Sequence, residues 1–244
     1  MKTMRLDLYL CERGLADSRT AAKSFILSGA VKVDGKTVTK PAYSIESDDI
    51  EIEVDTSSRK YVSRGGLKLE AALDAFDVRV EGRLAIDIGA SSGGFTDCLI
   101  KHGAAHVIAV DSGTSQLSPS LAEHPLVTSL ENYNARYMKR EELEYVPDLA
   151  VMDVSFISAT YIIPAIYDCL DENSDFICLI KPQFEVGKSN IGKGGIVKNE
   201  SARRSALDKV VDFAGAIGFQ CIATITSPIT GGDGNIEFLA HFKK

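Results

Sequence analysis

An apolar strand that runs directly into a glycine-rich turn constrains this 244-residue chain most strongly. Residues 84–98 read LAIDIGASSGGFTDC, with Asp87 near the end of the apolar run and glycines at 89, 93 and 94. Strand–turn–helix units of this kind build open parallel sheets, which bind ligands at the carboxyl ends of their strands. The GxxxGG spacing differs from the GxGxxG pattern of dinucleotide sites. The turn therefore predicts a ligand crevice, with a tight corner that binds nothing as the alternative.

Short apolar runs alternate with helix-like segments from residue 83 onward. Strands are expected at 83–88, 106–111, 126–130, 148–153, 175–181, 219–226 and 236–242, and helices at 93–102, 157–169 and 200–217. This alternation predicts an α/β fold with a doubly wound, mostly parallel sheet of seven strands and helices on both faces. The last two strands are joined without a helix, so we expect one of them to be antiparallel.

The first 45 residues form a different, basic module. They contain eight Lys and Arg against four Asp and Glu, a net charge of +4 in a chain whose total is −7. Leucines around residues 6–13, apolar residues at 22, 25 and 26, and the Asp34-Gly35 turn predict two helices and a small sheet. We therefore expect a small α+β domain over residues 1–60 and a second domain over 61–244, with a polar hinge at about 55–65.

Acidic residues follow the first three predicted strands of the second domain. Asp87 and Asp111 end the first two strands, and Glu131 and Asn132 follow the third. A carboxylate attracts a ligand amino group and accepts hydrogen bonds from ribose hydroxyls, whereas it repels a pyrophosphate. Glu131 and Asn132 suit an adenine edge. A pocket for an ammonium group, a ribose and an adenine, without a phosphate, predicts S-adenosylmethionine as the cofactor.

Charged residues also end the fourth and fifth strands, at Asp153 and Lys181. With Lys68 and Glu237 they form a candidate Lys–Asp–Lys–Glu cluster. Two amines and two carboxylates can favour the neutral form of one lysine, which could then take the proton from a ribose 2′-hydroxyl. Taken singly, Asp153 and Lys181 also fit ordinary charged strand ends.

Several stretches of the chain resemble the TlyA family, which also carries the name hemolysin A. The matching stretches are 5–7, 13–19, 29–35, 62–69, 87–98, 153–158, 181–185 and 234–237. Members are ribosomal RNA 2′-O-methyltransferases with an N-terminal S4 RNA-binding domain and an FtsJ/RrmJ-like class I methyltransferase domain. The resemblance implies a Rossmann-like methyltransferase sheet preceded by an S4-like domain, with S-adenosyl-L-methionine as the cofactor. It implies a cytidine of 23S rRNA as the substrate and leaves 16S rRNA open; the short segments before Arg5 and after Glu237 resemble the 23S-restricted form.

The resemblance also implies roles for individual residues. The family's catalytic tetrad corresponds to Lys68, Asp153, Lys181 and Glu237, with Lys181 as the base. The cofactor contacts correspond to Asp87, Gly89, Ala90, Ser91, Gly93, Gly94, Asp111, Glu131 and Phe156, to which the adenine argument adds Asn132. The RNA contacts correspond to Arg5, Arg19, Lys40, Arg64 and Arg136, to which the spacing from Arg19 along one helix adds Lys23. On charge alone, that helix face also fits an ordinary solvated surface.

The sequence also bears on whether the chain is a membrane, secreted or metal-binding protein. No run approaches the roughly 18 apolar residues of a membrane helix, and charges interrupt the N-terminus too early for a signal peptide, so a cytoplasmic protein is expected. The five cysteines are scattered, and His102 and His106, the one histidine pair with metal-ligand spacing, are expected to straddle a helix-to-strand turn rather than to share one helix face, so no metal is expected. The alternatives are a cytolysin, which the family name suggests, a non-catalytic S4 RNA-binding factor and a small-molecule methyltransferase. The basic, glycine-rich loop 187–195 fits a lid over RNA or a plain flexible loop.

Overall fold

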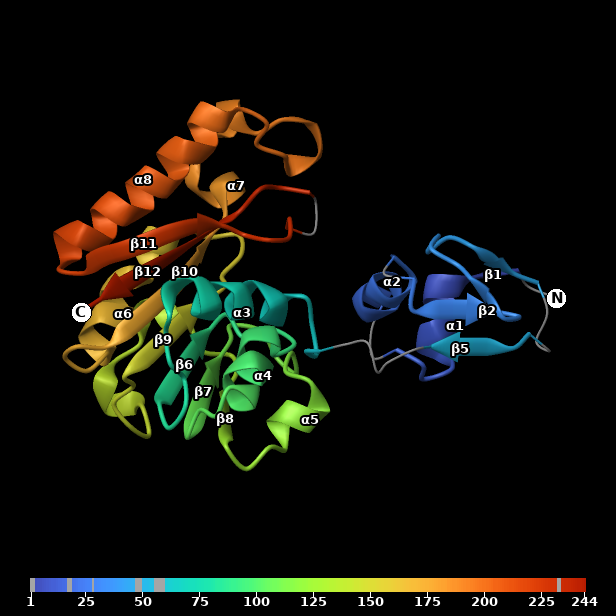
Figure 1. The fold of residues 1–244 in the computed structure, drawn as a ribbon, viewed down its shortest axis with the longest axis horizontal. Coiled ribbons are helices and arrows are strands. Elements are labelled where there is room, and N and C mark those ends of the chain that lie inside the picture. The colour runs from blue at the N-terminus through green and yellow to red at the C-terminus, as the bar shows by residue number, and fades with distance from the viewer. Residues whose placement is uncertain (1–2, 17–18, 28, 47–49, 55–59, 232–233) are drawn as a thin grey trace. The chain divides into compact units, whose positions relative to one another are not determined.

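The chain folds into two compact units, Met1–Lys60 and Tyr61–Lys244 (Figure 1). The computed structural model describes residues 3–16, 19–27, 29–46, 50–54, 60–231 and 234–244. Residues 17–18 of the family-like stretch 13–19, and residues 55–59 of the expected hinge, lie outside the described residues.

The N-terminal unit is a small α+β fold, as the sequence predicts. Its elements are β1 (Met4–Arg5), α1 (Leu6–Glu12), α2 (Arg19–Leu27), β2 (Val31–Val33), β3 (Lys36–Thr37), β4 (Ser44–Ile45) and β5 (Ile52–Val54). β2 pairs antiparallel with β3 and β5, and β1 pairs with β4. Asp34 and Gly35 take φ angles of 47° and 73° between β2 and β3, as a tight hairpin requires. Leu6, Leu10 and Ile26 from the two helices are fully buried in its core.

The larger unit is built on a seven-stranded sheet with the order β11-β12-β10-β9-β6-β7-β8. The strands are β6 (Leu84–Ile88), β7 (His106–Val110), β8 (Val127–Leu130), β9 (Leu149–Met152), β10 (Asp175–Ile180), β11 (Gln220–Thr226) and β12 (Phe238–Lys243). β8, β7, β6, β9 and β10 are parallel, whereas β12 runs antiparallel to both β10 and β11. The expectation of one antiparallel strand among the last two is therefore confirmed.

Helices cover both faces of this sheet (Figure 1). They are α3 (Gly65–Phe76), α4 (Gly94–Lys101), α5 (Pro119–Ala122), α6 (Ile163–Cys169), α7 (Pro182–Glu185) and α8 (Glu200–Ile217). Apolar side chains of α3 and α4 pack on one face and those of α6 and α8 on the other. Residues of β9 alternate between these two layers, so the strand is buried throughout. Among the described residues, no helix is long and apolar enough to cross a bilayer.

The expectation of one continuous helix over 157–169 is wrong. A short 3-10 turn, η3 (Ala159–Tyr161), comes first, and α6 begins only at Ile163. Ser158 caps η3 by accepting a hydrogen bond from the Thr160 amide, and Pro164 lies at the start of α6. Proline has no N–H to donate, so it fits the first turn of a helix but not its interior. The helical segment is therefore interrupted before Pro164, and α6 starts there as a new helix.

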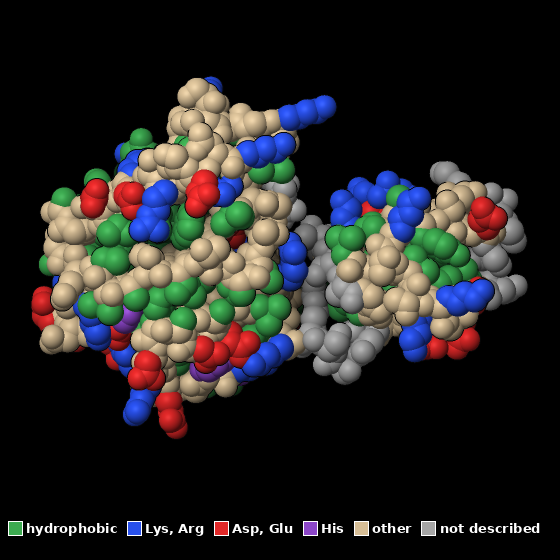
Figure 2. Space-filling view, turned by 45° about the horizontal axis from the view of Figure 1, so that its top comes forward, with side chains coloured by type: hydrophobic (Ala, Val, Ile, Leu, Met, Phe, Trp, Pro, Cys, Tyr) green, Lys and Arg blue, Asp and Glu red, His purple; other side chains and the backbone are tan. Residues whose placement is uncertain are grey.

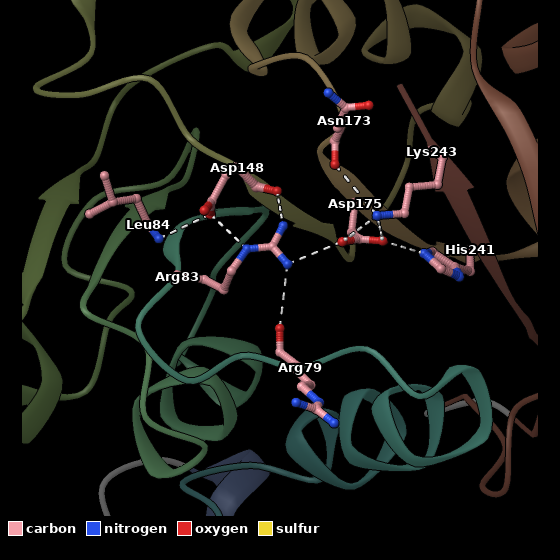
Figure 3. Close-up of polar contacts among 8 residues, drawn as sticks. All are labelled: Arg79, Arg83, Leu84, Asp148, Asn173, Asp175, His241 and Lys243. Atoms are coloured by element: carbon pink, nitrogen blue, oxygen red, sulfur yellow. Dashed lines mark hydrogen bonds and ion pairs between the residues drawn. The ribbon is translucent and has the colours of Figure 1, made fainter.

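Arg83 and Asp175 form an ion pair at the edge of the large sheet where β6 and β10 begin (Figure 3). Arg83 precedes β6 and lies 3.0 Å from Asp148 and 3.1 Å from Asp175. From β12, His241 and Lys243 lie 2.7 and 3.0 Å from Asp175. Burial opposes the ionisation of Asp175, but the hydrogen bonds from these three side chains outweigh it and lower its pKa to about 2. This network ties the strands together at the edge where the parallel strands begin.

Candidate active site

The glycine turn after β6 packs against the next strand end. Gly89 and Gly93 have φ angles of 83° and 94°, which non-glycine residues rarely adopt. A Cβ on Gly89 would lie 2.6 Å from the backbone oxygen of Asp153, and one on Gly93 would lie 2.3 Å from the Leu121 side chain. The packing of the protein itself therefore requires glycine at both positions.

Asp87 is the buried acid of this turn. Its Oδ2 accepts a hydrogen bond of 2.7 Å from Thr96, while its Oδ1 has no hydrogen-bond partner among the described residues. Burial raises the pKa of Asp87 to about 7, against the Thr96 hydrogen bond and with help from the nearby charges of Asp153 and Asp111. A positively charged ligand group beside Oδ1 would stabilise the ionised form of this buried carboxyl.

The acids after β7 and β8 shape the next part of the crevice. Asp111 accepts hydrogen bonds from the backbone amides of Ser91 and Gly113, at 2.8 and 2.7 Å. Glu131 accepts from the amides of Leu117, Ser115 and Gln116, and these bonds lower its pKa. Asn132 has a φ of 53° and accepts from the Thr114 hydroxyl at 2.6 Å. Glu131 and Asn132 thus hold the loop 113–117 that follows β7, a use that their sequence positions do not reveal. Ala90 is buried beside Leu117 and Leu121.

The four charged candidates form two close lysine–carboxylate pairs. Lys181 Nζ, directly after β10, lies 2.5 Å from Asp153 Oδ1 after β9 and donates to Ser155 Oγ at 2.8 Å. Lys68 Nζ on α3 lies 2.5 Å from Glu237 Oε2 before β12, and both side chains are buried. One member of each pair, Lys181 and Glu237, lines the same pocket of about 320 Å³. The fold thus gathers residues from four distant segments at the carboxyl edge of the parallel strands.

Phe156 stands at the mouth of this pocket. Its side chain is 92% exposed, its φ is 65°, and its ring centroid lies 5.3 Å from that of Phe184. The side chains of Gln183 and Ser155 complete this part of the lining. An exposed phenylalanine in a strained conformation is unusual, and such strain persists where the surrounding structure holds it in place.

Glu185 anchors the same loop two residues after Phe156, at Ser158, and sequence reasoning missed its role. Its carboxylate is buried and accepts hydrogen bonds from Ser158 Oγ at 2.6 Å and the Ala159 amide at 2.7 Å. Lys209 of α8 donates to the same carboxylate at 3.0 Å. Glu185 therefore fastens the loop after β9 to the segment after β10. The only sequence signal for it was its place in the family-like stretch 181–185.

The RNA-binding candidates are exposed basic side chains distributed over both units. In the N-terminal unit, Arg5 and Arg19 both contact the buried Asp7, at 3.0 and 3.5 Å, and the hydrogen bond from Arg5 chiefly lowers the pKa of that carboxyl. Lys23 and Lys40 are exposed. Figure 2 shows Lys and Arg side chains close together along one edge of this unit. In the larger unit, Arg64 and Arg136 are exposed.

Two family models match the chain. Residues 61–244 match the model of the FtsJ-like methyltransferases, and residues 4–50 match the S4 domain. The chain belongs to the FtsJ-like methyltransferase family. Structures that share only the fold of this FtsJ-like methyltransferase include an S-adenosylmethionine dependent methyltransferase from Mesorhizobium loti. That structure is 14% identical, with a TM-score of 0.53 over 71% of this chain and 96% of its own.

Closer relatives confirm the resemblance of this FtsJ-like methyltransferase to the TlyA family. The 16S/23S rRNA (cytidine-2′-O)-methyltransferase TlyA of Mycobacterium tuberculosis is 42% identical over 96% of this chain and 87% of its own. Hemolysin A of Brachyspira hyodysenteriae is 43% identical over 98% of this chain and 99% of its own. A solved structure of a protein described as a hemolysin, from Streptococcus thermophilus, is 43% identical, with a TM-score of 0.80 over 100% of this chain and 89% of its own.

Proposed function

We propose that this protein transfers the methyl group of S-adenosylmethionine to the ribose 2′-hydroxyl of a cytidine in ribosomal RNA. The 23S rRNA is the proposed substrate, and 16S rRNA is the second one to test. The observation that carries the proposal is that Lys181, paired with Asp153, and Glu237, paired with Lys68, line the same pocket, while the backbone of Asp153 packs against the glycine turn. The activity named for the Mycobacterium tuberculosis relative supports the same reaction. Because ribosomal subunits are the substrate, a cytoplasmic protein is expected.

The crevice fits S-adenosylmethionine on chemical grounds. The unpartnered Oδ1 of the buried Asp87 favours a ligand that carries a positive amino group. Asp111 is anchored by two backbone amides and keeps lone pairs for ribose hydroxyls. The family-like contacts at Gly89, Ala90, Ser91, Gly93, Gly94, Glu131, Asn132 and Phe156 complete the proposed cofactor site. When bound, this cofactor supplies an electrophilic methyl group attached to a sulfonium sulfur.

The residues of the pocket divide the remaining work. Lys181, in its neutral form, accepts the proton of the 2′-hydroxyl, and Asp153 and Ser155 hold its amine at 2.5 and 2.8 Å. Lys68 and Glu237, buried and paired, position the ribose. The reaction is a displacement at a methyl carbon, so orientation and electrostatics account for most of the acceleration. A target base inside a stack must be flipped out, which costs a few kcal/mol.

The N-terminal unit and the exposed arginines position the RNA in this proposal. Arg5, Arg19, Lys23 and Lys40 are on the S4-like unit, and Arg64 and Arg136 are on the methyltransferase unit. Lysine and arginine contacts to phosphate fix register without reading sequence. Folded RNA is recognised largely through its shape and backbone, which suits such a surface.

Tritiated S-adenosylmethionine provides the test. The purified protein is incubated separately with unmodified 30S and 50S subunits, and the RNA is then digested with alkali, because a 2′-O-methyl group makes the adjacent linkage resistant. Label in alkali-resistant dinucleotides from 50S subunits alone is expected. Label from both subunits would extend the substrate to 16S rRNA. If neither is labelled while the cofactor binds, the assignment is wrong and a non-catalytic RNA-binding role becomes the better one.

A further inference from the structure

Exposed aromatic side chains gather at the carboxyl edge of the large sheet. Among the described residues, three Phe or Tyr side chains are more than half exposed: Phe156 at 92%, Tyr137 at 66% and Tyr161 at 54%. Tyr137 lies in η1 (Ala135–Tyr137), which follows β8, and Tyr161 ends η3, which follows β9. Because β8 and β9 run in the same direction within the sheet, the loops after them leave from the same edge. This edge also carries the Lys181–Asp153 pair.

Arg136 contacts both tyrosine rings. Its guanidinium carbon lies 4.8 Å from the ring centroid of Tyr161 and 5.6 Å from that of Tyr137. These distances fall within the range of cation–π contact, which favours an arginine over a tyrosine face. The Arg136 amide is also held by the side chain of Asn134, which caps η1. The two ring contacts thus orient the guanidinium at the surface, where it remains exposed.

The position of Tyr161 is fixed from within the protein. Ser158 caps η3 and donates to the buried Glu185, which also accepts from the Ala159 amide. Phe156, in the same loop, lines the pocket with Lys181 and Glu237. Tyr161 therefore follows an anchored segment whose Phe156 lines the candidate catalytic pocket, and a ring that is already ordered binds with a small loss of conformational entropy.

We propose that Arg136, Tyr137 and Tyr161, here called the edge cluster, bind the unpaired RNA strand next to the target nucleotide. Arg136 pairs with a backbone phosphate, and the free faces of the tyrosine rings stack unpaired bases. Stacking on an aromatic side chain tolerates any base, so the edge cluster contributes affinity rather than sequence choice. This inference rests on the proposed function and deepens it by adding a surface for the strand beside the reacting ribose.

Steady-state methylation of unmodified 50S subunits tests the tyrosine contact. Tyr161→Leu removes the ring and should raise the KM for subunits roughly five- to 150-fold, the range for loss of one base stack, with a much smaller change in kcat. Tyr161→Phe keeps the ring and should stay within about threefold of the wild-type KM. Ile222→Ala, which changes a half-exposed side chain of β11, is the matched control. The affinity for S-adenosylmethionine should be unchanged in all three variants.

A double-mutant cycle separates stacking from mere support of Arg136. Arg136→Gln should reduce the salt dependence of subunit binding by about one counterion, whereas Tyr161→Leu should weaken binding without changing that slope. If Tyr161 stacks a base, Tyr161→Leu still raises KM in the Arg136→Gln background. Loss of the Tyr161 effect in that background, or an unchanged KM in the single variant, overturns the inference. An inactive wild-type protein would instead remove the proposed function itself.

Discussion

Lys181 Nζ lies 2.5 Å from Asp153 Oδ1, and this contact joins the ends of two neighbouring parallel strands, β10 and β9. The backbone oxygen of the same Asp153 packs against Gly89 of the glycine turn. One residue therefore contacts both the candidate base and the wall of the proposed cofactor crevice. A variant of Lys181 should therefore separate methyl transfer from cofactor binding.

Lys181→Ala should strongly reduce methyl transfer without removing cofactor binding. Loss of a general base lowers turnover by roughly 10²- to 10⁴-fold. Single-turnover methylation of unmodified 50S subunits measures this loss, and calorimetric titration with S-adenosylmethionine measures binding, which should stay within a few-fold of wild type. A variant that loses cofactor affinity together with its circular dichroism spectrum would show a structural role for Lys181 instead.

Lys68→Met should destabilise the larger unit, because it leaves the buried Glu237 carboxylate without its partner at 2.5 Å. Breaking a buried pair from one side costs about 3–5 kcal/mol. Replacing both residues, in Lys68→Met/Glu237→Leu, should recover most of that stability because no charge is then buried alone. Urea unfolding followed by circular dichroism measures both variants. Methylation should be lost in both, and activity in the double variant would contradict a catalytic role for the pair.

Cofactor affinity should rise with pH and level off above about 7. Burial raises the pKa of Asp87 to about 7, so the folded, cofactor-free protein holds this proton up to neutral pH. The protonated Asp87 adds its full contribution to the free energy of unfolding below pH 4, and this contribution is lost as the pH rises through 7. A cationic ligand favours the carboxylate, so binding at pH 6 should release a proton. Calorimetry in two buffers of different ionisation enthalpy detects that release, and Asp87→Asn should abolish it.

Asp175 should stabilise the fold at neutral pH and lose that effect in acid. Its folded pKa of about 2 lies below the ordinary value, so its contribution is present above pH 4 and is lost as the pH falls through 2. Asp175→Asn should therefore lower the free energy of unfolding by about 2–3 kcal/mol at pH 7, since it breaks charged contacts from Arg83, His241 and Lys243. Wild type and variant should converge near pH 2, and a constant difference across this range would contradict the account.

The sequence located most strands of the large sheet because their residues are apolar on both faces. β9 was expected at 148–153 and occupies Leu149–Met152, and β10 was expected at 175–181 and occupies Asp175–Ile180. In contrast, β1 and β4 contain two residues each and exist only because Met4 pairs with Ile45 and Arg5 with Ser44. A strand of that length has no periodicity to detect, so only the folded structure defines it.

Part of the candidate site could also be predicted from the sequence, and part of it could not. Strand ends and family-like stretches predicted that Lys68, Asp153, Lys181 and Glu237 belong to the site. They could not predict that these residues form two separate pairs. Glu185 and Asp97 were missed for a related reason. Glu185 accepts a hydrogen bond from Ser158, and Asp97 accepts one of 2.8 Å from the backbone amide of Val62. Each role depends on a partner that is distant in the sequence and becomes a neighbour only on folding.

The last strand of the sheet in chain order, β12, lies between β10 and β11 rather than at an edge. Glu237 enters the site directly before this strand, and its partner Lys68 stands 169 residues earlier in the chain. During synthesis from the N-terminus, the facing sides of β10 and β11 stay unoccupied and Lys68 lacks this carboxylate until β12 has been made. A chain interrupted before Glu237 therefore lacks both the strand that joins β10 to β11 and the carboxylate that pairs with Lys68, so the large sheet and this ion pair are completed together by the last residues to be made.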